Sequence, residues 1–397
     1  MTAAPDTAPR ATRRVPAAAL AALAGPVSFG ITGPALVLGD IARALDVTIP
    51  AATSVVTAFG WGIAVGTPLM GALLARRGPR VALLVFALLI AVGAGLVLAV
   101  PVLAALVVGS GLQALGAAGM VVVAMSLAGD ARAMGAVTSA MAGLGAVAPL
   151  IGTQVEAALA WPAVLAMTVL SLAAVPFVLR RAEPRPAAAE PFDALGALLL
   201  TGLVTALVLV PQHPLPAAGG AIAAATLLAL HVRRVPHGFL PKAALAARRF
   251  TISAVLALLL AVVNFGLVYA APVRLADLTG WDAGGLGLAV VVPYLTGGAL
   301  SWLLVARSGR LRYPVLAAVL AAAAAAALAA VALGAAVLPI LFAGMLTGSL
   351  AASTGQGALA LHAGAAVPAA QRATAMGLFN LCYLLGAAFG PAIAALA

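Results

Sequence analysis

The chain has 397 residues, of which 64% are hydrophobic and only 8% are charged, and its mean hydropathy is +1.19. A soluble core does not need this much apolar material, so the composition excludes an ordinary soluble domain and predicts a membrane protein. The net charge of +11 would suit nucleic-acid binding, but the basic residues lie in alternate connections between apolar runs, and only Arg43 and Arg274 lie in the others. That distribution follows the positive-inside rule and argues against a nucleic-acid partner.

Taken in chain order, residues 1–14 form a polar tail, predicted to be disordered and cytoplasmic, that leads into a first helix acting as an uncleaved signal anchor. The apolar runs that follow are long enough to cross a bilayer. They predict thirteen crossings, at 15–38, 51–74, 81–100, 102–128, 134–159, 162–179, 194–211, 217–232, 250–272, 284–305, 313–332, 336–361 and 373–396. The alternation of basic connections places the N-terminus in the cytoplasm and the protein in a bacterial inner (plasma) membrane as a multi-pass protein.

The connections divide these crossings into two sets. Residues 15–179 are expected to form an N-terminal six-helix bundle, residues 180–249 a linker and a central two-helix hairpin, and residues 250–397 a C-terminal bundle of five helices. The segment 233–249 is basic and is expected to lie on the inner membrane surface. Because the total is odd, either a last helix is absent or the chain is incomplete. The predicted fold is an all-α membrane protein of two bundles with an inserted hairpin.

A short basic turn occurs twice. The stretch Gly71 to Arg80 lies between two uncharged runs, and Trp302 to Leu311 repeats it, so that Arg76 aligns with Arg307 and Gly78 with Gly309 at one offset. An internal repeat built on a helix-turn-helix of this kind is typical of a duplicated membrane transporter.

Several motifs together resemble the major facilitator superfamily, most closely its 14-helix drug:proton antiporter branch. Gly71 to Arg80 is similar to the family's signature in the loop between its second and third helices. Gly145 to Gly152, which contains Pro149, resembles the antiporter signature of the fifth helix, and Gly386 to Pro391, with Gly390, is its counterpart in the second half. The region from Leu278 through Pro293 resembles the ninth-to-tenth helix region of the 14-helix branch, and Thr32 with Leu38 and Ile41 resembles its first helix.

The sequence also departs from the family pattern. The loop aspartate is Ala75 here, the arginine of the fourth helix falls on Ser110, and the aspartate of the first helix falls on Gly30. The resemblance implies an antiporter with alternating access, whereas the loss of these charged positions favours an uncoupled facilitator as an alternative.

The resemblance gives roles to both motifs, and each has a plainer alternative. It implies that the loop with Gly71, Arg76, Gly78 and Arg80, together with Arg307 and Gly309, latches the halves, whereas an ordinary positive-inside loop would need the same charges. Pro and Gly together bend a helix. Such a bend would give either a pliable contact between the halves or a static kink that serves only helix packing. The positions concerned are Gly145, Pro149, Gly152, Gly390 and Pro391.

Of the ten acidic residues, only Glu156 falls inside a predicted crossing. An ionisable group in the membrane is costly and is by default a functional candidate, so Glu156 is the first candidate for proton coupling, provided that it is buried toward a cavity. Asp40, just past the first crossing, is the second candidate. The alternative for Glu156 is a carboxylate that reaches the outer interface, and for Asp40 a solvated loop acid.

A few polar side chains lie within the apolar crossings and should point into the protein. We expect them to line a mostly apolar substrate cavity, at positions Gln113, Asn264, Tyr294, Gln356 and Asn380. The alternative is hydrogen bonding between helices, which is worth less than about 1 kcal/mol per contact.

These observations predict a secondary transporter that exports small hydrophobic or amphipathic compounds, coupled to protons if Glu156 or Asp40 titrates. An uncoupled facilitator of a small metabolite and a non-transporting scaffold or sensor on the same fold are the alternatives. The expected partners are a small-molecule substrate, protons and membrane lipid, and the expected state is a monomer. No pattern of an enzyme, a metal site or a cofactor is present, and no phosphate-binding loop that ATP hydrolysis would need.

Overall fold

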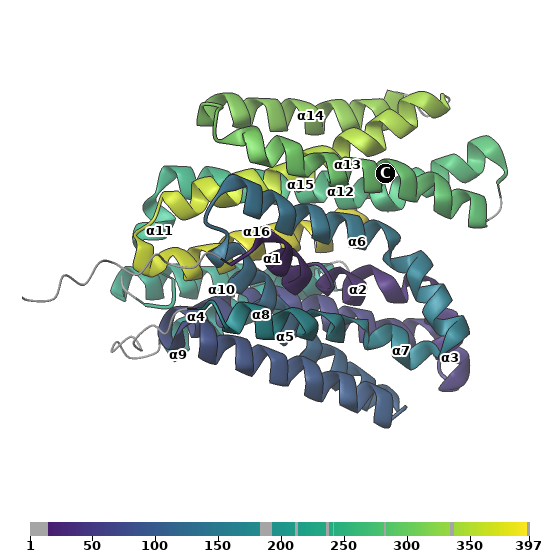
Figure 1. Cartoon of the computed structure of the whole chain (residues 1–397), viewed down its shortest axis with the longest axis horizontal. Coiled ribbons are helices and arrows are strands. Elements are labelled where there is room, and N and C mark those ends of the chain that lie inside the picture. Colours follow the sequence, from purple (N-terminus) through teal and green to yellow (C-terminus); the bar gives the residue numbers. More distant parts are fainter. Residues whose placement is uncertain are drawn as a thin grey trace, which may run out of the picture.

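The computed structural model describes residues 15–182, 193–210, 213–235, 238–240, 242–281, 283–333 and 337–394. Within these ranges the helices run mainly along the long axis of the molecule (Figure 1). The first part of the chain forms α1 (Ala17–Ala24), α2 (Val27–Thr32), η1 (Gly33–Leu36), α3 (Leu38–Ala44), α4 (Ile49–Ala99), α5 (Leu103–Leu127), α6 (Ala131–Ala158), α7 (Trp161–Leu165), η2 (Met167–Ala174) and α8 (Val175–Leu179). The rest forms α9 (Ala194–Leu209), α10 (Pro214–Arg234), α11 (Lys242–Ala246), α12 (Arg248–Thr279), α13 (Ala283–Ser308), α14 (Tyr313–Leu333), α15 (Leu338–Ala365), η3 (Ala369–Gln371) and α16 (Arg372–Ala394).

Every predicted crossing coincides with a helix or with a series of short helices, so the predicted all-α fold is confirmed. Among the described residues, eight helices are long and apolar enough to span a membrane, and the longest of them contains two predicted crossings. The basic turns gather at one end of the molecule, near α11 at the left of Figure 1, and α3 and α7 lie at the other end. We call these the basic end and the opposite end.

Two crossings that were predicted as continuous helices are broken, and this corrects the sequence analysis. The run 15–38 is divided into α1, α2 and η1 at Gly25-Pro26 and at Gly33-Pro34, and the run 162–179 is divided into α7, η2 and α8. Proline has no N–H to donate, so the helix ladder is interrupted there. Irregular backbone survives at membrane depth only where protein buries it, and α1 and α2 indeed pack against α6 and η2.

Helix α4 joins the second and third predicted crossings through one glycine. Gly78 has φ 74° and ψ 171°, which is non-helical, and the helix continues on both sides of it. This combination of angles is open almost only to glycine. The turn predicted at 71–80 is therefore a sharp reversal at a single residue.

The helices of the central hairpin, α9 and α10, pack on each other, and α9 also contacts α4 and α16. The Asp193 carboxylate caps α9 by accepting the Gly196 N–H at 2.8 Å, and it also accepts the Phe239 N–H at 2.8 Å and lies 2.8 Å from Nε2 of His231. Burial by itself would raise the pKa of Asp193, but these hydrogen bonds outweigh burial and hold the pKa below its ordinary value. One carboxylate thus ties both helices of the hairpin to the segment that follows them.

The helices that meet between the two halves form crossed pairs. Helix α4, which carries the first basic turn, packs against α16, and α13, which ends at the repeated turn, packs against α6. Helices α6 and α16 carry the two Gly/Pro motifs. In each pair, therefore, a helix with a basic turn from one half meets a helix with a Gly/Pro motif from the other half. Two bundles related by a pseudo-two-fold axis produce this arrangement.

Candidate functional site

The contact between α4 and α16, which we call the first seam, is closed by glycines near the basic end. A Cβ added at Gly377 would lie 2.6 Å from the Thr67 carbonyl oxygen, and one at Gly71 would lie 3.0 Å from the Ala373 carbonyl oxygen. Contacts this short require the two backbones to touch directly, which small residues permit in membrane helices. The glycine that begins the predicted loop motif thus contacts the other half of the chain.

The contact between α6 and α13, the second seam, combines small residues with hydroxyl groups. A Cβ at Gly135 would lie 3.0 Å from the Trp302 carbonyl oxygen, and one at Gly298 would lie 2.9 Å from the Ala142 side chain. The Ser139 hydroxyl donates to the Gly298 carbonyl oxygen and lies 3.2 Å from the Ser301 hydroxyl. Both seams are therefore packed tightly toward the basic end.

The basic turn itself is anchored within its own half. Arg80 Nε donates to the Ala182 carbonyl oxygen at 2.7 Å, just beyond the end of α8. A guanidinium is favourable at a helix carboxyl end. Arg76 is half-buried near the end of the α4 segment before Gly78, whereas Arg307 is exposed in the last turn of α13 and Gly309 has open space around it. The role of this loop as a latch stays a prediction.

The bend motif of α6 packs against the broken first crossing. Because Pro149 has no N–H, the carbonyl oxygen of Gly145 lacks its usual helical donor. The Thr32 hydroxyl lies 3.0 Å from this oxygen and 3.1 Å from the Ser28 carbonyl oxygen, and can donate to either. A Cβ at Gly152 would lie 2.6 Å from the Gly33 carbonyl oxygen. In the structure, these two glycines therefore lie at contacts inside one half.

In the second half, the counterpart motif packs in a similar way. A Cβ at Gly386 of α16 would lie 2.6 Å from the Leu258 carbonyl oxygen of α12. Gly390 and Pro391 lie within α16, and their side-chain surroundings are outside the described residues. A helix with the Gly/Pro motif thus contacts the first crossing of its own half in both repeats.

Four of the predicted cavity residues are brought together in pairs. The Tyr294 hydroxyl donates to the Asn264 carbonyl oxygen at 3.5 Å, and Gln356 Nε2 donates to Asn380 Oδ1 at 3.2 Å. All four side chains are buried, and Oδ1 of Asn264 has no hydrogen-bond partner among the described residues. The pairs join α12 to α13 and α15 to α16, which agrees with the alternative of helix-to-helix bonding and leaves a cavity role as a prediction.

Gln113 lies elsewhere, between two crossings of the first half. Its side chain is fully buried, and its Cγ would be 2.8 Å from a Cβ at Gly93 of α4. Neither polar atom of the amide has a hydrogen-bond partner within the described part of the chain. Such a group is costly in an apolar setting, and the cavity role of Gln113 stays a prediction.

The two predicted proton carriers lie side by side. The side chains of Asp40, on α3, and Glu156, at the far end of α6, lie near enough to interact, and the Arg43 guanidinium bonds Asp40. The side chain of Asp40 is 37% exposed, so this cluster is reached from the opposite end of the molecule. Two neighbouring carboxyl groups repel each other when both are ionised, which keeps this pair as the candidate for proton coupling.

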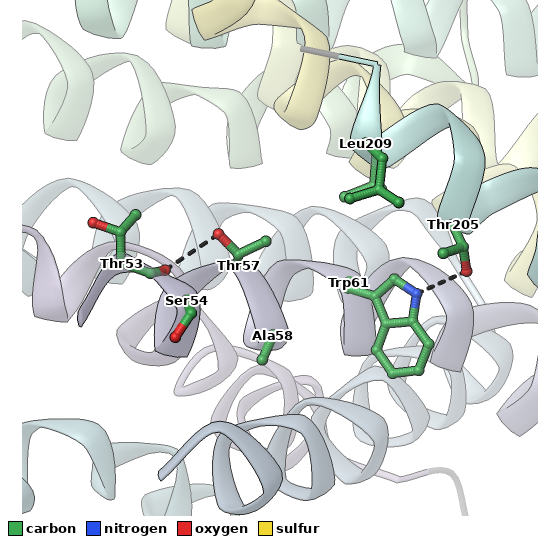
Figure 2. Close-up of a pocket in the computed structure, with 8 residues that line it drawn as sticks. Thr53, Ser54, Thr57, Ala58, Trp61, Thr205 and Leu209 are labelled. Atoms are coloured by element: carbon green, nitrogen blue, oxygen red, sulfur yellow. Dashed lines mark hydrogen bonds between the residues drawn. The ribbon is translucent and has the colours of Figure 1, made fainter. Parts of the chain in front are cut away.

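A cavity of about 790 Å³ opens between α4 and α9, toward the opposite end. Thr53, Ser54, Thr57, Ala58 and Trp61 of α4 line it together with Thr205, Val208 and Leu209 of α9 (Figure 2). Trp61, the lining residue nearest to the first seam along α4, lies about 9 Å from Thr67 along the helix axis, at the rise of an α-helix. Sequence reasoning missed these residues, although Thr53, Thr57 and Trp61 recur every fourth position and would place a polar stripe on one helix face.

In the ranges that the structure describes, no three His, Cys, Asp or Glu side chains lie close enough to hold a metal ion.

Comparisons with known proteins agree with this architecture. The sequence profile described as Major Facilitator Superfamily matches residues 18–394. No curated protein matches the sequence. Among solved structures, the fold is similar to that of the human organic anion transporter MFSD10 (TETRAN), with a TM-score of 0.65 and 17% identity over 97% of this chain and 93% of that one.

Two further structures share the fold. The POT family transporter PepTSo gives a TM-score of 0.58 at 18% identity, over 96% of this chain and 89% of that one. The proton:xylose symporter XylE gives 0.57 at 16% identity, over 94% and 87%. At these identities the likeness concerns the fold alone.

Proposed function

The chain belongs to the major facilitator superfamily and is a multi-pass membrane transporter, and on this premise we propose that it exports small hydrophobic or amphipathic compounds by alternating access, coupled to proton entry. The observation that carries the proposal is the pair of crossed seams, α4 with α16 and α6 with α13. Two related bundles that meet mainly through such helix pairs can tilt about a central site. The bundles are 15–179 and 250–397, with 180–249 between them.

The orientation follows from charge. The basic end, with Arg76, Arg80 and Arg307, faces the cytoplasm under the positive-inside rule, and the N-terminus lies there too. The seams are packed toward this end, whereas the cavity and the Asp40–Glu156 cluster lie toward the opposite end. The structure is thus best described as closed toward the cytoplasm. The inserted hairpin α9–α10 supports a relationship with the 14-helix drug:proton antiporter branch.

Proton coupling is assigned to the Asp40–Glu156 cluster. The Asp40 side chain is accessible from the outside, so protonation of the cluster there and release of the proton toward the cytoplasm would drive export. Arg43 supplies a positive charge that favours release once the surroundings change. The loop aspartate of the family, absent at Ala75, has no part in this scheme.

The test is transport in proteoliposomes that contain the purified protein and the pH dye pyranine. Addition of a transported neutral amphiphile to vesicles with a pH gradient should move protons in the opposite direction, and Glu156→Gln and Asp40→Asn should abolish proton movement. Compound flux that persists unchanged after collapse of the gradient would show a facilitator instead. Failure to bind or move any of a broad panel of amphiphiles and metabolites would favour a non-transporting scaffold.

A further inference from the structure

The cavity between α4 and α9 has a wall of unusual chemistry for a space inside a membrane protein. Hydroxyl side chains and one indole supply its polar atoms, and the remaining lining residues are Ala58, Val208 and Leu209. Its described wall contains no charged side chain. Helix α9 belongs to the inserted hairpin and also contacts α16, so the hairpin closes one side of a space next to the first seam.

The hydrogens of three of these hydroxyl groups are already engaged. Thr57 donates to the Thr53 carbonyl oxygen at 3.2 Å, and Ser54 donates to the Ala51 carbonyl oxygen at 2.6 Å. Thr205 donates to the Thr201 carbonyl oxygen at 2.8 Å. A hydroxyl that donates within its helix still has lone pairs on its oxygen. The wall therefore presents acceptors at these three positions.

The indole of the wall is engaged as well. Trp61 Nε1 donates to the Thr205 hydroxyl oxygen at 2.9 Å, as the dashed line in Figure 2 shows. This bond joins α4 to α9 and uses the only hydrogen-bond donor that the indole has. The face of the ring stays available for apolar and aromatic contact.

From this geometry we propose that the cavity binds a neutral amphiphile that has an apolar or aromatic body and at least one hydrogen-bond donor, such as a secondary amine of low basicity or a hydroxyl. A donor on the ligand would pair with the Thr57 or Ser54 oxygen, and the body would lie along Trp61 and Leu209. A lipophilic cation fits less well, because its charge would leave water without an acidic partner. The inference rests on the proposed function, since it names the substrate class of the transporter.

The experiment measures binding to the full-length purified chain in lipid nanodiscs, by energy transfer from tryptophan. The ligand is N-phenyl-1-naphthylamine, which is neutral and carries one N–H, and its N-methyl derivative has the same body without the donor. Thr57→Val removes the acceptor at nearly constant shape. We expect this substitution to weaken the N–H compound about 5- to 10-fold and to leave the N-methyl compound unchanged.

The matched control is Thr226→Val, because Thr226 makes the same bond within its helix on an exposed face of α10. A filling substitution, Ala58→Trp, should abolish binding of both compounds if they occupy this space. Equal binding of the two compounds, or equal effects of the two valine substitutions, would overturn the proposal and leave a groove that holds lipid chains by apolar contact alone. Donor-selective binding without transport in liposomes would overturn the proposed function and leave the site standing.

Discussion

The close packing of α4 on α16 in the first seam can be tested by adding one methyl group. In the substitution Gly377→Ala the new Cβ would lie 2.6 Å from the Thr67 carbonyl oxygen and 3.1 Å from Pro68 Cα. Ordinary contact begins at 3.4 Å, so α4 and α16 must separate by about 0.8 Å, the difference between 3.4 and 2.6. The atoms that clash are backbone atoms, so no change of rotamer relieves them. Overpacking of this kind costs about 1–3 kcal/mol.

The cost falls on the state in which this seam is packed. The ratio of the closed to the open state at the basic end should therefore drop about 5- to 160-fold, which lowers transport and exposes the seam. The assay is the rate at which an impermeant maleimide labels Ala75→Cys, in a Cys382→Ala background that removes the single native cysteine. Position 75 lies one turn from Gly71 on the same face of α4.

The control is Gly95→Ala, because an added Cβ there meets nothing within 4 Å. Labelling should be faster with Gly377→Ala than with Gly95→Ala, while both proteins keep a cooperative thermal transition. Parental labelling and parental transport with Gly377→Ala would refute the idea that this contact seals the basic end.

Three further predictions concern the turn, the bend and the hairpin. Gly78→Ala should lower the free energy of unfolding by about 1–3 kcal/mol, because the backbone angles of Gly78 are open almost only to glycine. Gly309→Ala, at the repeated position, should change the free energy of unfolding little. Equal effects of the two substitutions in thermal denaturation would contradict this prediction. Thr32→Val should lower the free energy of unfolding by about 1–2 kcal/mol, because it leaves the Gly145 carbonyl oxygen unpaired, and Thr32→Ser should restore most of the stability. A valine variant as stable as the parent would contradict this prediction. The lowered pKa of Asp193 means that its stabilisation is complete well above the ordinary value of 3.8 and is lost as the pH falls through the folded value. Asp193→Asn should therefore lower the melting temperature more at pH 7 than at pH 3; a difference that is the same at both pH values would exclude this account.

The apolar runs and the basic turns by themselves determined the positions of the crossings, because in a membrane every helix must be long, uncharged and complete in its own hydrogen bonds. The repeat of Gly71 to Arg80 at Trp302 to Leu311 determined that the halves are related, and the crossed seams agree with it. The reversal at Gly78 was also predictable, since a basic Gly-Pro turn lies between two spanning runs.

The partners of each side chain were decided only by tertiary structure. Apolar periodicity is weak in a chain that is hydrophobic on every face, so nothing in the sequence told which side of α6 meets α13 and which meets α2. Glu156 and Asp40 are 116 positions apart and come near each other only because η1, which directly precedes α3, packs against α6. The cavity depends on where the hairpin helix α9 packs. Because lipid is as apolar as the helix surface, the position of α9 is determined by close packing and by the Trp61–Thr205 hydrogen bond rather than by any local sequence pattern.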